Sequence, residues 1–232
     1  MTPRLSPHSD RSALDATPDD MTAPPGGWIE LSDEALLTRM LLRGLRPETA
    51  ACASAALMAR FGGLGPALAA DAGEIERATG LDPGLVGELH LLREISVRIS
   101  RARASGRSLL ASSSAVHAYV RAALAHRPRE QFRTLYLDRR NALLQDEWVA
   151  DGSVDHAPVY PREVIRRALE LSASALILVH NHPSGDPEPS QADVVMTRKI
   201  VDAAKVFDIR VHDHLIVGRE DTASLRALGH LS

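Results

Sequence analysis

The sequence predicts an α/β (α+β) domain that is preceded by a small all-helical domain. Residues 31–104 repeat apolar side chains at helical spacing. From Phe132 onward, short apolar runs alternate with amphipathic helical patterns, which is typical of one sheet flanked by helices. The chain between these regions is rich in serine and indicates a linker. We therefore expect a disordered tail over residues 1–27, a helical domain over 28–105 and a second domain over 106–232.

Composition limits the class of protein. The chain has 232 residues, and 44% of them are apolar, which supports a real core. A net charge of −3 does not favour general attraction to nucleic acid or to anionic membranes. The single cysteine, Cys52, excludes an internal disulfide and fits a reducing compartment. No apolar run approaches the length of a membrane span, and the N-terminal residues lack the hydrophobic region that is typical of a signal peptide. We expect a cytoplasmic protein without a membrane partner, with Cys52 as a small core residue.

The helical domain is predicted from caps and periodicity. Residues 1–27 are rich in Pro, Ser, Thr, Asp and Gly and lack periodic apolar residues, which favours disorder. Ser32 or Asp33 can then cap a first helix that ends near Gly44. Further helices are expected over residues 47–60, near 65–66, over 71–78 and over 85–104.

Two features of this domain bear on DNA binding. The turn from Gly80 to Gly84 is similar to a helix-hairpin-helix module, whose glycine amides bind phosphate. Asp82 stands where a second glycine is usual and places a negative charge there, which favours a packing hairpin instead. An arginine cluster follows on the long helix, and it either contacts nucleic acid or forms a solvated face. Its members are Arg93, Arg98, Arg101, Arg103 and Arg107.

The second domain alternates strands and helices. Strands are expected over residues 132–137, 142–149, 175–179 and 209–217, with a turn over 138–141. Helices are expected over residues 115–125, after Pro161 and over 192–206.

The candidate site lies after the most apolar strand, residues 175–179. His180 and His182 are two residues apart, so both emerge on the same face of the strand end. A stiff, proline-rich loop then leads to Ser190 and Asp193 at the start of a helix. Two imidazoles and a carboxylate make a three-ligand zinc site with a fourth position open for water, although iron or manganese would also fit. The alternative is that Ser190 and Asp193 form only a capping box.

The spacing His180-x-His182, seven residues, Ser190, two residues, Asp193 resembles the JAMM (JAB1/MPN) metalloprotease motif. The longer string from His180 to Ser190 resembles the RadC family (UPF0758), historically labelled DNA repair proteins. Residues 159–164 and 213–218 are similar to further family segments, and the likeness covers roughly residues 30–230. The resemblance implies a curved sheet of the cytidine-deaminase type, flanked by helices. A contiguous His-Asn-His triplet does not support an HNH nuclease.

The resemblance also implies an activity. Relatives of this type are zinc-dependent hydrolases that cleave an amide or isopeptide bond with metal-activated water, so one Zn²⁺ ion and a peptide or isopeptide substrate are expected. In JAMM enzymes the general base is a glutamate on an upstream strand, and Glu147 matches that position. Asp146 and Glu163 are its competitors. Ser190 is expected to help to hold the developing oxyanion.

Other functions stay open at this point. One is a non-catalytic, DNA-associated accessory protein with a structural metal, and another is a metal-dependent nuclease, which would need a basic cleft. His212 and His214 either orient a metal ligand or belong to the polar face of the last strand. His156 has no assigned role, and the sequence predicts no oligomeric state.

Overall fold

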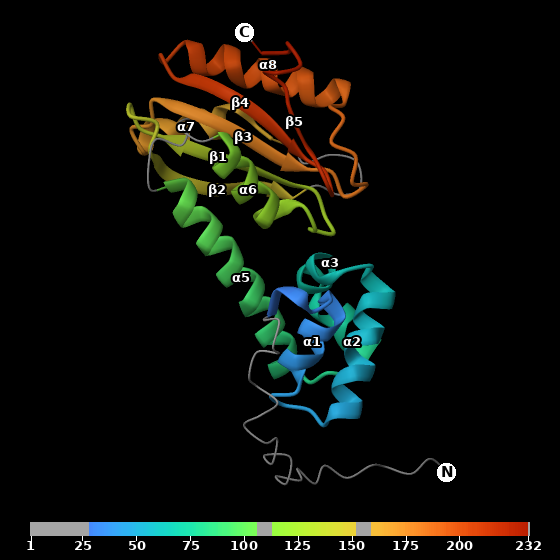
Figure 1. Cartoon of the computed structure of the whole chain (residues 1–232). Coiled ribbons are helices and arrows are strands. Elements are labelled where there is room, and N and C mark those ends of the chain that lie inside the picture. The colour runs from blue at the N-terminus through green and yellow to red at the C-terminus, as the bar shows by residue number, and fades with distance from the viewer. Residues whose placement is uncertain (1–27, 106–112, 152–158, 232) are drawn as a thin grey trace, which may run out of the picture. The chain divides into compact units, whose positions relative to one another are not determined.

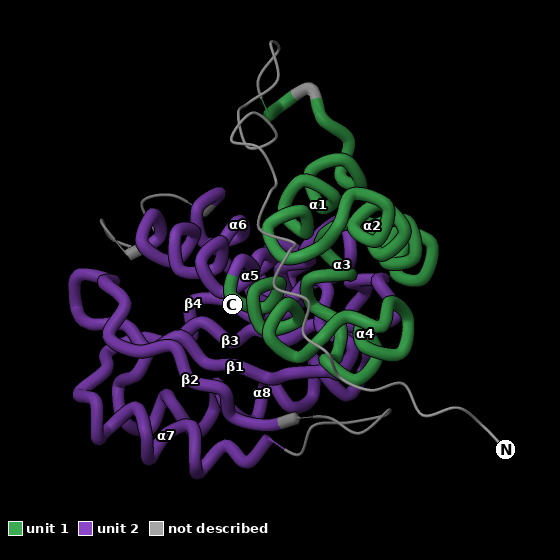
Figure 2. Tube along the Cα trace, turned by 90° about the horizontal axis from the view of Figure 1, so that it is seen from below, with its two compact units in different colours: residues 1–91 green, residues 92–232 purple. Residues whose placement is uncertain are grey.

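The computed structural model describes residues 28–105, 113–151 and 159–231. The chain divides into two compact units, Met1–Leu91 and Leu92–Ser232 (Figure 2). The predicted tail over residues 1–27 and residues 106–112 of the predicted linker, which was expected over 106–114, lie outside the described residues. The domain boundary expected near residue 106 therefore stays a prediction.

The first unit is helical around a core of its own. Ser32 accepts a hydrogen bond from the amide of Ala35 and caps the first helix, as expected. Leucine and alanine side chains dominate the core, with Leu41, Leu57 and Ile75 fully buried. Its elements are η3 (Trp28–Glu30), α1 (Asp33–Leu41), α2 (Pro47–Phe61), α3 (Leu64–Ala69), α4 (Ala72–Thr79) and the first part of α5 (Pro83–Ser105).

The hairpin between α4 and α5 is closed by its own aspartate. Gly80 adopts the left-handed conformation (φ 72°) that ends α4. The carboxylate of Asp82 accepts hydrogen bonds from the amides of Gly84 and Leu85, at 2.8 and 3.2 Å. These are amides that a bound phosphate would use, so the geometry agrees with a packing hairpin.

The prediction for Cys52 was wrong. Cys52 is exposed on α2. The buried face of this helix is formed by Ala50, Ala53, Ser54 and Leu57. In an alanine-rich helix the apolar stripe is poorly marked, so the sequence did not show which small residues face inward.

The second unit is built on one mixed sheet with strand order β2-β1-β3-β4-β5. β3 pairs antiparallel with β1 and parallel with β4. The predicted strands and helices are present, and β5 is an additional short edge strand. The elements are α6 (Ser113–Leu124), β1 (Gln131–Leu137), β2 (Leu143–Asp151), α7 (Pro161–Glu170), β3 (Ala175–Asn181), α8 (Gln191–Lys205), β4 (Arg210–Val217) and β5 (Thr222–Ser224).

Helices cover both faces of this sheet (Figure 1). α7 and α8 pack on one face, around a core that includes Phe132, Leu178 and Ile216. α6 packs on the other face, together with Ala104 near the end of α5. The expected α+β architecture is therefore confirmed, and every residue of the central strand β3 is buried. None of the described helices combines the length and apolar character that crossing a membrane requires.

Candidate metal centre

The end of β3 presents the two histidines. His180 is the penultimate residue of the strand, with 1% of its surface exposed. The amide of His182 donates to the carbonyl of Val217 at 3.0 Å, which continues the pairing with β4 past the end of β3. The two side chains therefore emerge on the same face, as the alternation of a strand predicts.

The start of α8 presents the carboxylate. Ser190 is the N-cap, and its side chain accepts a hydrogen bond from the amide of Asp193 at 3.2 Å. Asp193 Oδ2 in turn accepts from the amide of Ser190 at 2.8 Å and from its hydroxyl at 2.6 Å. Ser190 and Asp193 thus form a complete capping box, and the same carboxylate faces the two histidines.

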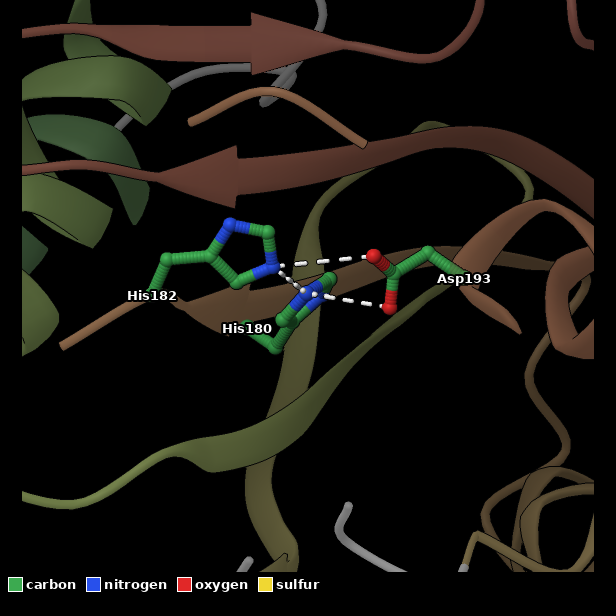
Figure 3. Close-up of side chains that lie close together, drawn as sticks. All are labelled: His180, His182 and Asp193. Carbon is green, nitrogen blue, oxygen red and sulfur yellow. Dashed lines mark hydrogen bonds and ion pairs between the residues drawn. The ribbon is translucent and has the colours of Figure 1, made fainter. Parts of the chain in front are cut away.

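Three ligand atoms converge at this point (Figure 3). His180 Nε2 lies 3.0 Å from His182 Nε2 and 3.3 Å from Asp193 Oδ1, and His182 Nε2 lies 3.6 Å from Asp193 Oδ2. Ligands 2.0–2.1 Å from a tetrahedral zinc ion are about 3.3 Å apart. The spacing therefore fits zinc. Among the described residues, these three form the group of His, Cys, Asp and Glu side chains that could hold a metal ion.

The residues behind His180 determine which of its nitrogens is free. Thr197 Oγ1 donates to the carbonyl of Asp193 at 2.6 Å, so it can only accept from His214 Nδ1, also at 2.6 Å. Burial lowers the pKa of His214 well below its usual range, so this ring is neutral and its Nε2 is an acceptor. His180 Nδ1, 2.8 Å from that atom, must then donate its proton.

Both histidines are therefore left with a bare Nε2. Burial lowers the pKa of His180 to about 4, which keeps its ring neutral with a lone pair on Nε2. His182 Nδ1 donates to the carbonyl of Asp186 at 2.8 Å, so the neutral form of this ring also has its lone pair on Nε2. Two lone pairs and a carboxylate that face one another at 3.0–3.6 Å require a cation or a proton between them.

A proton competes with a cation for the space between these groups. When no cation is bound, hydrogen bonding to the Asp193 carboxylate raises the pKa of His182, which favours a proton on its Nε2. Burial alone would raise the pKa of Asp193, but the neighbouring His182 and His180 rings and the hydrogen bonds from Ser190 hold it below its usual range. The carboxylate is thus anionic and available as a ligand at neutral pH.

Glu147 stands apart from the three ligands. Glu147 lies on β2 and pairs with Thr134 on β1, which in turn pairs with Leu178 on β3. Glu147 is therefore two strands away from the histidines, and it faces the side of the sheet that α7 covers. Its carboxylate accepts a hydrogen bond from Arg167 Nε on α7 at 2.6 Å. The structure does not bring Glu147 into the ligand cluster, and its role as the base stays a prediction.

Asp146 and Glu163, the two other candidates for the general base, also lie away from the three ligands. Asp146 lies on the opposite face of the sheet, where it accepts hydrogen bonds from Arg133 and from Tyr119 on α6. Glu163 is on the exposed face of α7 in an ion pair with Arg166. Asp146 therefore points away from the ligand cluster, behind the sheet.

The remaining histidines are two residues apart on β4, and a β-bulge separates them: Leu176 pairs with Val211 and Ile177 with Asp213, so His212 is the extra residue. His214 is fully buried and orients His180, whereas His212 bonds to the side chain of Asn141 at 2.7 Å. His214 therefore orients a proposed metal ligand, whereas His212 belongs to the polar residues of the strand. His156 lies outside the described residues.

Two supporting residues were missed from the sequence. Thr197 fixes the tautomer of His214, and its spacing of four residues from Asp193 along a helix could have indicated it. Asn181 points to the other face of β3, where it accepts from the amide of Gln131 at 2.9 Å and donates to the carbonyl of Arg129 at 3.1 Å. The strand end is therefore anchored on both of its faces.

Comparisons with known proteins identify the family of the chain. The sequence profile of a family described as the RadC-like JAB domain matches residues 110–230. A relative named UPF0758 protein, from Rhodobacter capsulatus, is 47% identical over 206 residues, which span 89% of this chain and 96% of the relative.

Proposed function

Since the chain belongs to the family of proteins with a RadC-like JAB domain, we propose that it is a zinc-dependent hydrolase that cleaves an amide or isopeptide bond in a peptide substrate. The observation that carries this proposal is the convergence of two bare imidazole nitrogens and one carboxylate at tetrahedral spacing. Within the described part of the chain three protein ligands converge, which is the pattern of catalytic rather than structural zinc sites.

The three ligands and Ser190 would have different roles in the reaction. His180, His182 and Asp193 would hold the ion, and zinc would polarise the substrate carbonyl and lower the pKa of a water molecule. Ser190 Oγ lies 2.6 Å from Asp193 Oδ2, at the edge of the ligand set; its single proton, which donates to Asp193 in this structure, would turn to the developing oxyanion. The cap would keep this hydroxyl oriented in the absence of substrate.

Glu147 is proposed as the general base. Two strand spacings and an offset of two residues place its Cα atom roughly 12 Å from that of His180, on the same face of the sheet. The ion pair with Arg167 has to open for this role, because the guanidinium group occupies the carboxylate oxygen that would have to accept a proton. We therefore expect that substrate binding displaces Arg167 from Glu147.

The test compares a ligand variant with a base variant. His182→Ala should lose zinc, because two remaining ligands hold the ion poorly. Glu147→Gln should keep zinc and its melting temperature but lose hydrolysis by roughly two to four orders of magnitude, the usual contribution of general acid–base catalysis. Metal content by mass spectrometry, thermal melting and one isopeptide cleavage assay on each variant measure these effects.

Two controls make the result decisive. Glu163→Gln removes a carboxylate on α7 that is exposed and should leave hydrolysis unchanged. The parent protein with its zinc removed should be as inactive as His182→Ala. If Glu147→Gln loses zinc, Glu147 is a ligand, and if it keeps full activity, the base is another group. A zinc-loaded parent that cleaves a nucleic acid substrate but no amide would replace the proposal with a nuclease.

A further inference from the structure

A basic cavity lies in the second unit, beside α6 and the second half of α5. Its volume is about 270 Å³, and its walls come from α5, α6, the segment after α6 and β1. Five arginines and a single carboxylate line it: Arg93, Arg98, Arg101, Arg127, Arg133 and Glu94. The cavity lies on the α6 face of the sheet, whereas the three metal ligands lie on the face that α7 and α8 cover.

The inner wall is formed by partly buried guanidinium groups. Arg93 Nη2 donates to the carbonyl of Ala123 at 2.6 Å, which fixes this side chain against α6. Arg133 has 22% of its side chain exposed and is held by Asp146 through two hydrogen bonds, at 2.9 and 3.0 Å. Tyr119 also donates to Asp146, so the acceptors of this carboxylate are engaged by β1 and α6.

The outer rim is exposed. Arg98 has 76% of its side chain exposed, and its Nε donates to Glu94 at 2.8 Å, one helical turn earlier. The carboxylate of Glu94 is thus paired at the rim of the cavity, whereas the partly buried Arg93, Arg127 and Arg133 form its inner wall. Burial, followed by the nearby charge of Arg127, lowers the pKa of Arg93 to about 10. Positive charge is therefore crowded at the inner wall, which an anion would relieve.

We propose that this cavity binds a phosphate group carried by a small molecule. Guanidinium groups match phosphate oxygens through paired hydrogen bonds, and several of them converging on one cavity suit a dianion better than a single carboxylate. The cavity is slightly smaller than the pockets of about 300–1,000 Å³ that hold drug-sized ligands, so a phosphate with a small organic group would fill it. Duplex DNA is contacted mainly through exposed cations, whereas this inner wall is recessed.

This proposal does not depend on the hydrolase. The cavity and the ligand cluster lie on opposite faces of the sheet and share no residue. Phosphate binding should therefore persist after zinc has been removed, which also separates it from coordination of phosphate by the metal.

The experiment titrates inorganic phosphate and pyrophosphate into the full chain by isothermal calorimetry, in phosphate-free buffer, before and after removal of zinc with a chelator. We expect saturable binding with one site per chain in both states, and no binding of acetate. Arg93→Gln should weaken the binding roughly tenfold or more, as expected for the loss of a charged hydrogen-bond donor.

Two further variants separate the loss of phosphate binding from unfolding and from a general change in charge. Arg98→Gln changes an exposed side chain and cannot disturb the core, and it should weaken binding by a smaller factor. Arg140→Gln, at an exposed position in the turn after β1, removes the same charge outside the cavity and should change nothing. The proposal fails if no phosphate compound binds saturably, if the chelator abolishes binding, or if Arg140→Gln weakens it as much as Arg93→Gln. It also fails if only duplex DNA binds through Arg93, which would make the cavity a nucleic-acid contact.

Discussion

At the scale of single residues, His214 determines what His180 can do. A neutral imidazole can carry its proton on either nitrogen, and only one choice leaves Nε2 free for a metal. The hydroxyl of Thr197 makes this choice for His214, and His214 makes it for His180. Phe132 stacks on the ring of His180 with a centroid separation of 6.1 Å, which limits its rotation.

His214→Ala should therefore weaken zinc binding without removing a ligand. We expect a loss of about 10–100-fold in affinity, the usual effect of removing a group that orients a metal-bound histidine. The measurement is a competition titration with a chromophoric chelator. His212→Ala is the matched control, because it lies on the same strand and bonds to Asn141 instead. Equal losses in both variants would mean that β4 acts only through general stability.

At the scale of elements, the loop from residue 182 to residue 190, which joins the proposed metal ligands of β3 and α8, depends on its contact with the end of β4. Gly185 accepts a hydrogen bond from the amide of Arg219 at 2.9 Å. A Cβ atom at Gly218 would lie 2.5 Å from the carbonyl oxygen of Gly185 and 2.8 Å from Pro187 Cδ. These neighbours are backbone and ring atoms that have little freedom to move, so this close approach requires glycine.

Gly218→Ala should displace the loop and lower both zinc affinity and stability. We expect a destabilisation of about 1–3 kcal/mol, the usual cost of overpacking. Chemical denaturation and zinc titration measure the two effects. Gly87→Ala on α5 is the control, since a Cβ there meets nothing within 4 Å and alanine favours a helix. A loop that tolerates Gly218→Ala with unchanged zinc binding would contradict this account.

At the scale of the whole molecule, each unit has a core drawn from its own residues. The core of the first unit runs from Leu37 to Leu89 in the sequence, and those of the second unit begin with Val97. Ala104 is 4% exposed and packs with α6, so part of α5 belongs to the second unit. Separate cores predict separate folding.

A fragment of residues 92–232 should fold alone and bind zinc as tightly as the full chain. A fragment that begins at residue 110 should be less stable, because it lacks the packing of Val97 and Ala104 against α6. Thermal melting and zinc titration of both fragments test this expectation. Equal melting temperatures would show that α5 adds nothing to the second unit and would move the boundary to the predicted linker.

Sequence reasoning succeeded where the determinants are local. Caps, apolar periodicity and the spacing from His180 to Asp193 are properties of short segments, and the elements they predict are present. The contacts of Glu147 with Arg167 and of Arg93 with Ala123 join distant segments, so no local pattern reports them. The edge strand β5 has three residues and pairs only with β4, which leaves too short a pattern to detect.

All three proposed ligands belong to one continuous segment, residues 180–193. The entropy lost when a flexible chain is closed into a ring grows with the logarithm of its length, so closing this short ring costs little. We expect the ligand set to assemble early in folding, once β3 has met α8, with His214 fixing the imidazole of His180 afterwards. Bound zinc would act on this connection as a short cross-link does, joining the end of a strand to the first turn of the next helix.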